Sequence, residues 1–367
     1  MMNSRVLLAP VAPTALVRTE RVRVRTFPRI VAFGGGTGLP TVLRGLADAM
    51  VETLGPQNRA EWGDRLAAIV TVTDDGGSSG RLRRDLGVLP PGDIRNCLAA
   101  LSADDAFGRL LDHRFEGTTD LSGHAVGNLM LAALTRMTGS FPEAIDEMAR
   151  LVAARGRVFP STCEDVTLRA ELATGETVEG ETDIVRHPAR IRRVTLARGV
   201  RPWPDALRAL VNADVVVVGP GSLYTSVLPN LLVDGVSSTL AAISGFRICV
   251  ANLMTQPGET DGMSLDDHLR VVREHTGRDL FDCILVNSTK PTQAQLERYR
   301  RDGSELIARD GALRAAGGAR VVEADLLDTS SDHVRHDGAK LAAAILKISQ
   351  RARGISHAVP ITSTLCS

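Results

Sequence analysis

Short apolar runs rich in β-branched residues alternate along the chain with longer segments in which apolar residues recur every three or four positions. The short runs predict strands and the longer segments predict amphipathic helices, because side chains repeat every two residues in a strand and about every 3.6 in a helix. The runs at 215–218 and 283–286 are apolar throughout. Such strands are typical of a parallel sheet that helices cover on both faces.

We therefore expect an α/β fold with a Rossmann-like, doubly wound, mostly parallel sheet that carries helical and small antiparallel insertions. Strands are expected at 29–33, 66–73, 214–218, 247–251, 283–286 and 320–323. Helices are expected at 39–54, 94–101, 106–115, 126–137, 142–152, 204–212, 235–244, 265–275 and 339–350. The glycine- and charge-rich segment 76–89 predicts a loop, and Asp93 is expected to cap the helix at 94–101.

The period changes between 158 and 197, where apolar and polar residues alternate on either side of a turn. This pattern predicts an antiparallel β-hairpin inserted into the α/β fold. We expect a single domain over 29–350, with a mobile basic arm at 1–28 and a flexible tail at 351–367. The apolar stretch after Arg5 also resembles an export signal, but no clear small-residue cleavage site follows it.

Composition narrows the classes of function. The 367 residues contain 43 basic and 43 acidic residues, and only 3% are aromatic, so neither a polyanionic partner nor a base-stacking nucleic-acid reader is favoured. The sequence contains no run of eighteen apolar residues, so it predicts no membrane-spanning helix. The five cysteines are scattered without metal-ligand spacing, which favours a reduced, cytoplasmic protein.

Lysine is nearly absent, with Lys290, Lys340 and Lys347 the only examples. A P-loop, which needs a lysine beside its glycines, is therefore excluded in the first half of the chain. Anions bound there must be held by backbone N–H groups, hydroxyls and arginine.

Three glycine-rich loops each follow a predicted strand. They comprise Gly34, Gly35, Gly36, Thr37 and Gly38; Asp74, Asp75, Gly76, Gly77, Ser78 and Ser79; and Gly219, Gly221, Ser222, Tyr224 and Thr225. Glycine lets the backbone approach a ligand, and helix starts present N–H groups to anions. Because parallel strands end at one edge of a sheet, the loops predict a common site for a phosphorylated ligand. Leu39 and Thr41 break the dinucleotide-binding fingerprint, which disfavours a dehydrogenase.

Charged side chains near the second loop suggest two further features. Asp74 and Asp75 could accept bonds from ribose hydroxyls or bind magnesium through water. Arg81, Arg83 and Arg84 are expected on a solvated face that pairs with Asp85.

Arg95 and Asn96 fall in the first turn of a predicted helix, where cations are disfavoured. Arg95 should therefore have an anionic partner, either Asp74, Asp75 or a ligand phosphate.

Several further polar residues are candidates for a ligand-binding or structural role. His124 and Asn128 are four apart and are expected on one helix face, with His124 either an acid–base group or a hydrogen-bonded structural residue. Asn252 and Thr255 follow the strand at 247–251 and could orient a ligand. His333 and His336 lack a third ligand at close spacing, so a metal site there is disfavoured. No Ser–His–Asp arrangement follows from spacing.

Together these segments resemble the YvcK group, known as gluconeogenesis factors, within a superfamily that also contains the CofD phospholactate transferases. The resemblance runs from about residue 29 to 346. The shared motifs are GGGTG at 34–38, TDDGGSSGRLRRDLGVLPPGDIRNCL at 73–98, GHAVGN at 123–128, RGRVFPST at 155–162, GPGSLYTSVLPNLLV at 219–233, NLMTQPGETDG at 252–262 and HDGAKLA at 336–342.

The resemblance implies a cytoplasmic regulator that binds a UDP-sugar, particularly UDP-N-acetylglucosamine, and governs carbon flux in gluconeogenic growth, cell-wall precursor supply and cell shape. It requires no cofactor, with magnesium at Asp74 and Asp75 a candidate ion, and it leaves protein partners and a homo-oligomer open. The CofD branch implies an alternative, a magnesium-dependent transferase of a phospholactate- or phosphoenolpyruvate-type group onto a deazaflavin precursor. Met263 stands where the YvcK group usually has a tyrosine that could stack on the base, so base preference stays open.

Overall fold

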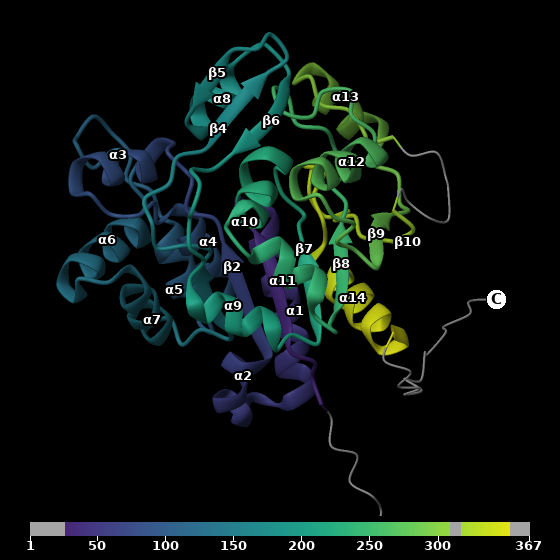
Figure 1. Ribbon diagram of the computed structural model, residues 1–367. Coiled ribbons are helices and arrows are strands. Elements are labelled where there is room, and N and C mark those ends of the chain that lie inside the picture. The colour runs from purple at the N-terminus through teal and green to yellow at the C-terminus, as the bar shows by residue number, and fades with distance from the viewer. Residues whose placement is uncertain (1–25, 309–316, 353–367) are drawn as a thin grey trace, which may run out of the picture.

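A seven-stranded parallel sheet forms the centre of the molecule (Figure 1). Its strands follow the order β10-β9-β8-β7-β1-β2-β3, and every neighbouring pair is parallel. They are β1 (Ile30–Gly34), β2 (Leu66–Val70), β3 (Arg157–Pro160), β7 (Val215–Val218), β8 (Phe246–Val250), β9 (Cys283–Asn287) and β10 (Arg320–Ala324). The expected α/β class with a Rossmann-like sheet is confirmed.

The computed structural model describes residues 26–308 and 317–352. Almost all of the expected arm at 1–28 and tail at 351–367 lies outside these residues. Within the described ranges, no helix is both long and apolar enough to cross a membrane.

The strand order creates one reversal in the middle of the sheet. From β1 the chain moves outward through β2 to β3, and then returns to the other side of β1 to build β7, β8, β9 and β10. Beyond the carboxyl ends of β1 and β7, the connections therefore leave in opposite directions. In open α/β sheets this switch point is where ligands bind.

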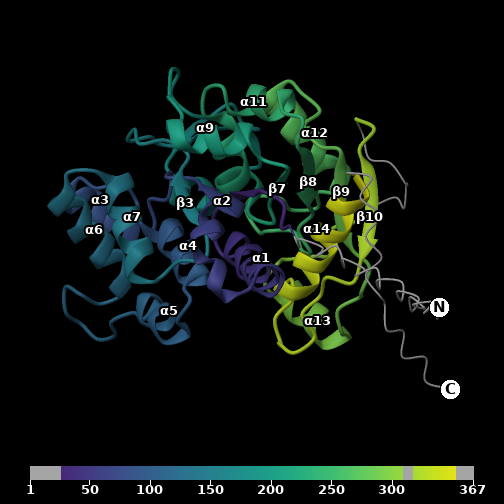
Figure 2. The same cartoon turned by 90° about the horizontal axis from the view of Figure 1, so that it is seen from below.

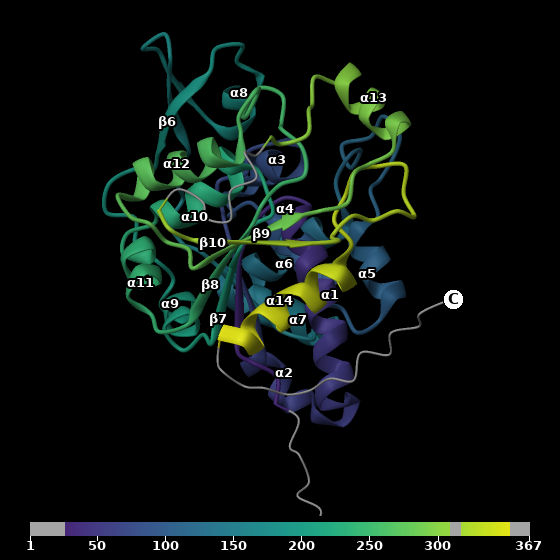
Figure 3. The same cartoon turned by 90° about the vertical axis from the view of Figure 1, so that its right-hand side faces the viewer.

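Helices cover both faces of the sheet, as Figures 2 and 3 show. On one face α1 (Gly38–Leu54) packs on α4 (Gly92–Leu101) and α14 (Gly338–Ala352). On the other lie α9 (Pro204–Val211), α10 (Leu228–Leu232), α11 (Val236–Ala242) and α12 (Leu265–Thr276). The closest approach within the first layer is at Gly45, where a Cβ atom would lie 1.9 Å from the carbonyl oxygen of Gly338. Only glycine fits this crossing.

The antiparallel insertion is a three-stranded sheet in the order β5-β4-β6, where we expected a hairpin. Its strands are β4 (Arg169–Leu172), β5 (Thr177–Glu179) and β6 (Ile191–Thr195), and α8 (Glu181–Arg186) connects the last two. Residues 157–160 belong instead to the main sheet as edge strand β3. The small sheet lies above the carboxyl edge of the main sheet, at the top of Figure 1.

Four helices form a lobe beside β3, on the left of Figure 1: α3 (Gly77–Leu86), α5 (Asp105–Asp112), α6 (Val126–Thr138) and α7 (Phe141–Leu151). Here the expectation of a loop at 76–89 was wrong. Ser78, Ser79 and Leu82 are buried, and Gly87, with a φ of +64°, caps α3 after its last residue, Leu86. Contact with α6 stabilises a helix that glycine and charge content disfavours locally.

Two further local differences concern helix boundaries. Helix α4 begins at Gly92, with Pro91 at its cap position, so Asp93 lies inside the first turn and does not cap the helix. The short helices α2 (Arg59–Arg65) and α13 (Gln293–Arg301) were not expected.

Candidate functional site

The loops after β1 and β7 pack directly against each other at the switch point. A Cβ atom on Gly38 would lie 2.3 Å from the carbonyl oxygen of Pro220, and one on Gly221 would lie 3.6 Å from that of Gly35. A side chain at Gly38 would force the loops apart, whereas one at Gly221 would only touch the other loop. The absence of side chains therefore permits two backbone segments to line one edge.

The loop after β2 and the start of α4 meet the same edge. A Cβ atom on Gly35 would lie 2.5 Å from a carboxylate oxygen of Asp93, and one on Gly92 would lie 3.0 Å from Oδ2 of Asp74. The backbone N–H of Gly36 donates to the Asp93 carboxylate. The three glycine loops thus converge, as their positions after parallel strands require.

The donors available to an anion come mainly from the first turn of α1. The N–H of Gly36 is occupied by Asp93, and the N–H of Gly221 donates to Oδ1 of Asn252 at 2.9 Å. Helix α1 begins at Gly38, immediately after the loop. First-turn N–H groups have no acceptor within their own helix and carry a positive partial charge.

Carboxylates surround this helix start, and three of them have raised pKa values. Burial, followed by the negative charge of Asp74, raises the pKa of Glu181 to about 9. Burial also raises the pKa of Asp93 to about 6 and that of Glu259 to about 7. The edge is therefore poor in positive side-chain charge, and a diphosphate there would need protons or a cation to offset these groups.

Sequence reasoning missed Glu181, Glu259 and the site position of Asp93. Glu259 lies in the motif at 252–262, so a signal for it was present. Glu181 follows β5 in the insertion, and no local pattern indicates that this segment folds back over the main sheet. Across the part of the chain that the structure describes, no three His, Cys, Asp or Glu side chains are close enough to hold a metal ion.

Asp74 and Asp75 face different elements. Oδ1 of Asp74 accepts the N–H of Gly76 at 2.9 Å. Oδ1 of Asp75 accepts both the N–H of Thr182 at 2.9 Å and its hydroxyl at 2.7 Å. Asp75 therefore holds α8 over the edge, while Asp74 points toward the start of α4.

Arg95 has an anionic partner, but not one of those expected. It forms an ion pair with Asp112 at the end of α5, and its Nε donates to Oδ1 of Asn128 at 3.3 Å. The pairing with Asp74, Asp75 or a phosphate is thus corrected. Asn96, also in the first turn of α4, donates to Asp93.

His124 was expected on a helix face with Asn128, but it precedes α6, which begins at Val126. Both side chains nevertheless contact Ser78: the hydroxyl lies 2.8 Å from Nδ1 of His124, and Nδ2 of Asn128 donates to it at 3.0 Å. Burial lowers the pKa of His124. These contacts join α3 to α6.

The expected solvated arginine face on α3 is correct only for Arg84, which is exposed. Arg81 donates to the carbonyl oxygen of Ser122 at 2.6 Å. Arg83 pairs with Asp165 at 2.5 Å rather than with Asp85. The reason is that α3 lies between the segments that carry these acceptors. Arg81 and Arg83 therefore bind neighbouring loops instead of facing solvent.

Asn252 and Thr255 bind protein backbone. Besides accepting from the N–H of Gly221, Asn252 donates through Nδ2 to its carbonyl at 2.8 Å. The hydroxyl of Thr255 accepts the N–H of Glu305 at 2.9 Å. The side chain of Ser222 accepts from Nε2 of Gln256 at 2.7 Å. These bonds fix the shape of the loop after β7.

A short π-helix at Leu223–Val227 carries Tyr224 and Thr225. Glu259 accepts the N–H of Tyr224 at 3.3 Å and the hydroxyl of Thr225 at 3.2 Å. A cavity of about 360 Å³ opens beside these residues, between the segment before β6 and α12, and Met263 lines it. This cavity adjoins the π-helix at Tyr224, whereas Gly219 and Gly221 line a separate, smaller cavity of about 40 Å³.

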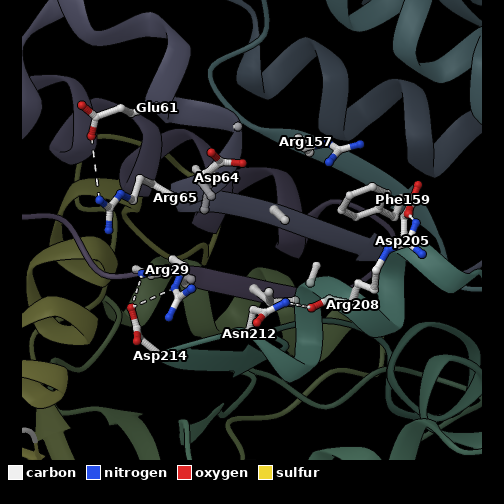
Figure 4. Close-up of a pocket in the computed structure, with 16 residues that line it drawn as sticks. Arg29, Glu61, Asp64, Arg65, Arg157, Phe159, Asp205, Arg208, Asn212 and Asp214 are labelled. Atoms are coloured by element: carbon white, nitrogen blue, oxygen red, sulfur yellow. Dashed lines mark hydrogen bonds and ion pairs between the residues drawn. The ribbon is translucent and has the colours of Figure 1, made fainter.

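A wider cavity of about 840 Å³ lies at the opposite edge, where β1 and β2 begin (Figure 4). Four arginines and four carboxylates line it, and three ion pairs join them: Arg29 with Asp214, Arg65 with Glu61, and Arg208 with Asp205. Its side-chain charge is balanced, and no glycine loop reaches it. We therefore place the candidate site at the carboxyl edge.

Comparison with known proteins gives consistent matches. The family model for 2-phospho-L-lactate transferase CofD matches residues 30–327. The chain is 40% identical to the gluconeogenesis factor of Halalkalibacterium halodurans, over 87% of this chain and 95% of that protein. It is also 40% identical to the gluconeogenesis factor of Bacillus subtilis, over 88% and 98%. A crystal structure of a UPF0052 family protein from Bacillus halodurans superposes with a TM-score of 0.79 at 39% identity, covering 87% of this chain and 99% of the other.

Proposed function

Since the chain belongs to the CofD family and to its gluconeogenesis-factor branch, we propose that it binds a nucleotide sugar of the UDP-N-acetylglucosamine class where β1 and β7 end. The observation that carries this proposal is the convergence of glycine loops at the switch point, with Gly38 closed against Pro220. This arrangement brings backbone N–H groups and a helix start to one edge without a lysine.

The diphosphate would lie on the first turn of α1, beside the loop Gly219–Ser222, in which the N–H groups of Gly219 and Gly221 already have partners. Each hydrogen bond to a charged group contributes about 1.5–3 kcal/mol, so several can hold a diphosphate. Asp74 would contact the ribose or a cation, and Asp75 would act through its contact with Thr182. The base or sugar would extend toward the cavity beside Tyr224 and Met263.

We further propose a regulatory role in the cytoplasm, acting on carbon flux, cell-wall precursor supply and cell shape. The names of the relatives as gluconeogenesis factors support the link to carbon metabolism. In such a role, occupancy of the site follows the concentration of the nucleotide sugar, and the bound and free forms of the protein act differently on a partner. Co-purification of the bound nucleotide from cells is the direct check.

Isothermal titration calorimetry with UDP-N-acetylglucosamine, with and without magnesium, tests the binding. We expect saturable binding to the wild type and at least a tenfold loss for Gly36→Val and for Asp74→Ala. Gly36 has a φ of +61°, so valine strains the loop itself. The matched control is Gly87→Val, since Gly87 has a φ of +64° and open space around it at the far end of α3. Absence of binding, or equal losses for Gly36→Val and Gly87→Val, would reject the proposal.

A second candidate function is transfer, as in the CofD enzymes. The observation that favours it is the group of Asp74, Asp93 and Glu181 beside the glycine loops, where burial and then mutual repulsion raise the pKa values of Asp93 and Glu181. A divalent cation would relieve that repulsion and, when bound, would neutralise charge on the donor's diphosphate, from which a nucleoside monophosphate would leave. Asp74 and Asp93 are the side chains best placed to hold it.

Incubation with a nucleotide donor, a deazaflavin acceptor and magnesium distinguishes transfer from binding alone. Transfer predicts release of a nucleoside monophosphate, at least a hundredfold slower for Asp74→Asn. Binding without any release would leave the regulatory proposal and eliminate this one.

A further inference from the structure

Ser78 and His124 lie side by side, although 46 residues separate them in the sequence. Ser78 is the second residue of α3, and His124 immediately precedes the cap of α6. The serine hydroxyl and Nδ1 of the imidazole are 2.8 Å apart. The two residues are only 5% and 7% exposed. A buried hydroxyl therefore faces a buried imidazole.

Arg95 fixes the orientation of the Asn128 amide. A guanidinium can only donate, so the Asn128 atom that faces it must be the oxygen Oδ1. The other amide atom, Nδ2, then donates to the Ser78 oxygen at 3.0 Å. Of the two side-chain atoms that the Ser78 hydroxyl contacts in the described residues, Nδ1 of His124 is the one that can accept its proton. We therefore assign Nδ1 as the unprotonated acceptor of this bond.

The surroundings favour a neutral imidazole that can accept this proton. Burial lowers the pKa of His124, and the positive charge of Arg81 on α3 lowers it further; Asp85 acts in the opposite direction, and Arg114 after α5 adds a smaller lowering effect. Ser78 also lies at the start of a ten-residue helix. The positive partial charge there stabilises a developing alkoxide.

We propose that Ser78 is a nucleophile activated by His124, and that this pair reacts with phosphoryl esters or anhydrides. In the step, the Oγ–phosphorus bond forms as the bond from phosphorus to the leaving group breaks, and the leaving group takes that electron pair. The Ser78 proton passes to Nδ1 of His124, which can return it to the leaving group. The guanidiniums of Arg81 and Arg114 favour a phosphoryl over a neutral acyl substrate.

Asn128 and Arg95 are positioning residues in this proposal. Arg95 is anchored by Asp112, and it orients the Asn128 amide, which in turn orients the hydroxyl. The proposal does not depend on nucleotide-sugar binding, because its reacting atoms lie on the side of α3 that faces α6. Ser79, the next residue, instead accepts the N–H of Gly92 at 3.1 Å.

Diisopropyl fluorophosphate tests the pair, because it is small enough for a nearly buried hydroxyl and loses fluoride when serine attacks phosphorus. We expect the full-length chain to gain one adduct, located on Ser78 by peptide mass spectrometry. The adduct should be absent from Ser78→Ala and should form at least tenfold more slowly in His124→Gln. Ser238→Ala should label as the wild type, because the hydroxyl of Ser238 is exposed and donates only to a carbonyl.

The pH dependence of wild-type labelling is a second readout that needs no folded variant. The rate should be constant above about pH 7 and fall below the ordinary histidine range, as His124 becomes protonated. No adduct, an adduct only at another residue, or equal rates in folded His124→Gln would overturn the proposal. A rate that rises tenfold per pH unit up to pH 9 would also overturn it, because that is the behaviour of an unassisted hydroxyl.

Discussion

At the scale of single residues, Glu181 shows how a folded environment changes a carboxyl group. Burial and neighbouring carboxylates raise its pKa to about 9, whereas the unfolded chain leaves it near the usual value for glutamate. Because its folded pKa is raised, stability from this group is complete below pH 4 and is lost as pH rises toward 9. Replacing it with an uncharged isostere should remove that loss.

We therefore expect Glu181→Gln to be more stable than the wild type at pH 8, with no advantage at pH 4. The difference in free energy of unfolding should grow with pH by up to about 1.4 kcal/mol per unit in the intervening range. Urea unfolding at pH 4, 6 and 8 measures it. The exposed Glu179→Gln serves as the control and should show no such slope. A Glu181→Gln variant that is no more stable than the wild type at pH 8 would contradict the raised pKa.

Met263 offers a gain-of-affinity prediction that rests on the proposed function. It lines the cavity beside Tyr224 and Glu259, where a base could lie against its thioether. A ring contact contributes about 0.5–1.5 kcal/mol beyond area burial, so Met263→Tyr should bind UDP-N-acetylglucosamine about 2- to 10-fold more tightly. Calorimetry measures the change, with Met263→Leu as the size-matched control. Weaker binding by Met263→Tyr would place the base elsewhere.

The sequence predicted the glycine loops, Asp74 and Asp75 at the candidate site, but it did not predict Glu181 or Glu259 there. Gly34 to Gly38 and Gly219 to Ser222 could be placed because each loop follows an apolar strand, and parallel strands end at one edge. Glu181 and Asp112 could not, since their partners depend on how the insertion and α5 pack. Spacing likewise gave no reason to pair Ser78 with His124.

At the scale of elements, the crossing of α1 and α14 depends on a single missing side chain. A Cβ atom on Gly45 would lie 1.9 Å from the carbonyl oxygen of Gly338, and backbone cannot yield as a side chain can. We expect Gly45→Ala to lower the free energy of unfolding by about 1–3 kcal/mol, the usual cost of overpacking. Urea unfolding measures it.

Gly63→Ala is the matched control for this crossing. Gly63 is also helical, but an added Cβ would meet only side-chain carbons of Arg157, the nearest at 3.4 Å. Its helix propensity should make that variant neutral or slightly more stable. Equal effects of the two substitutions would show that helix propensity, not the contact with α14, governs Gly45.

Elements with strong periodicity were predictable, and those stabilised by neighbours were not. The four valines of β7 and the amphipathic repeat of α12 predicted their own structure within one or two residues. Helix α3 was missed because its glycines and charges disfavour a helix locally. The contact with α6 that stabilises it comes from a segment far along the chain. The third strand of the insertion was missed for the same reason.

At the scale of the whole molecule, the switch point joins two halves of the sheet that the chain builds separately. One half contains β1, β2 and β3, and the other contains β7 to β10. Within the described main sheet, the two halves meet where β1 pairs in parallel with β7, from Ile30↔Val215 to Phe33↔Val218. A ligand held by the loops after both strands would stabilise this boundary.

We therefore expect UDP-N-acetylglucosamine to raise the melting temperature of the entire described domain in one cooperative transition. At a free concentration of 100 times Kd, the added stability is about 2.7 kcal/mol, which corresponds to a rise of several degrees in a chain of this size. Differential scanning calorimetry measures both the shift and the number of transitions.

Gly36→Val should melt without a ligand-dependent shift, whereas Gly87→Val should shift as the wild type does. Two transitions, of which only one responds, would mean that the halves unfold separately and that the expected single domain at 29–350 is wrong. A single transition that moves with ligand would support the single domain, because a ligand bound to one part of a cooperatively unfolding unit stabilises all of it. The loss of that shift in Gly36→Val, but not in Gly87→Val, is what locates the ligand at the loop after β1.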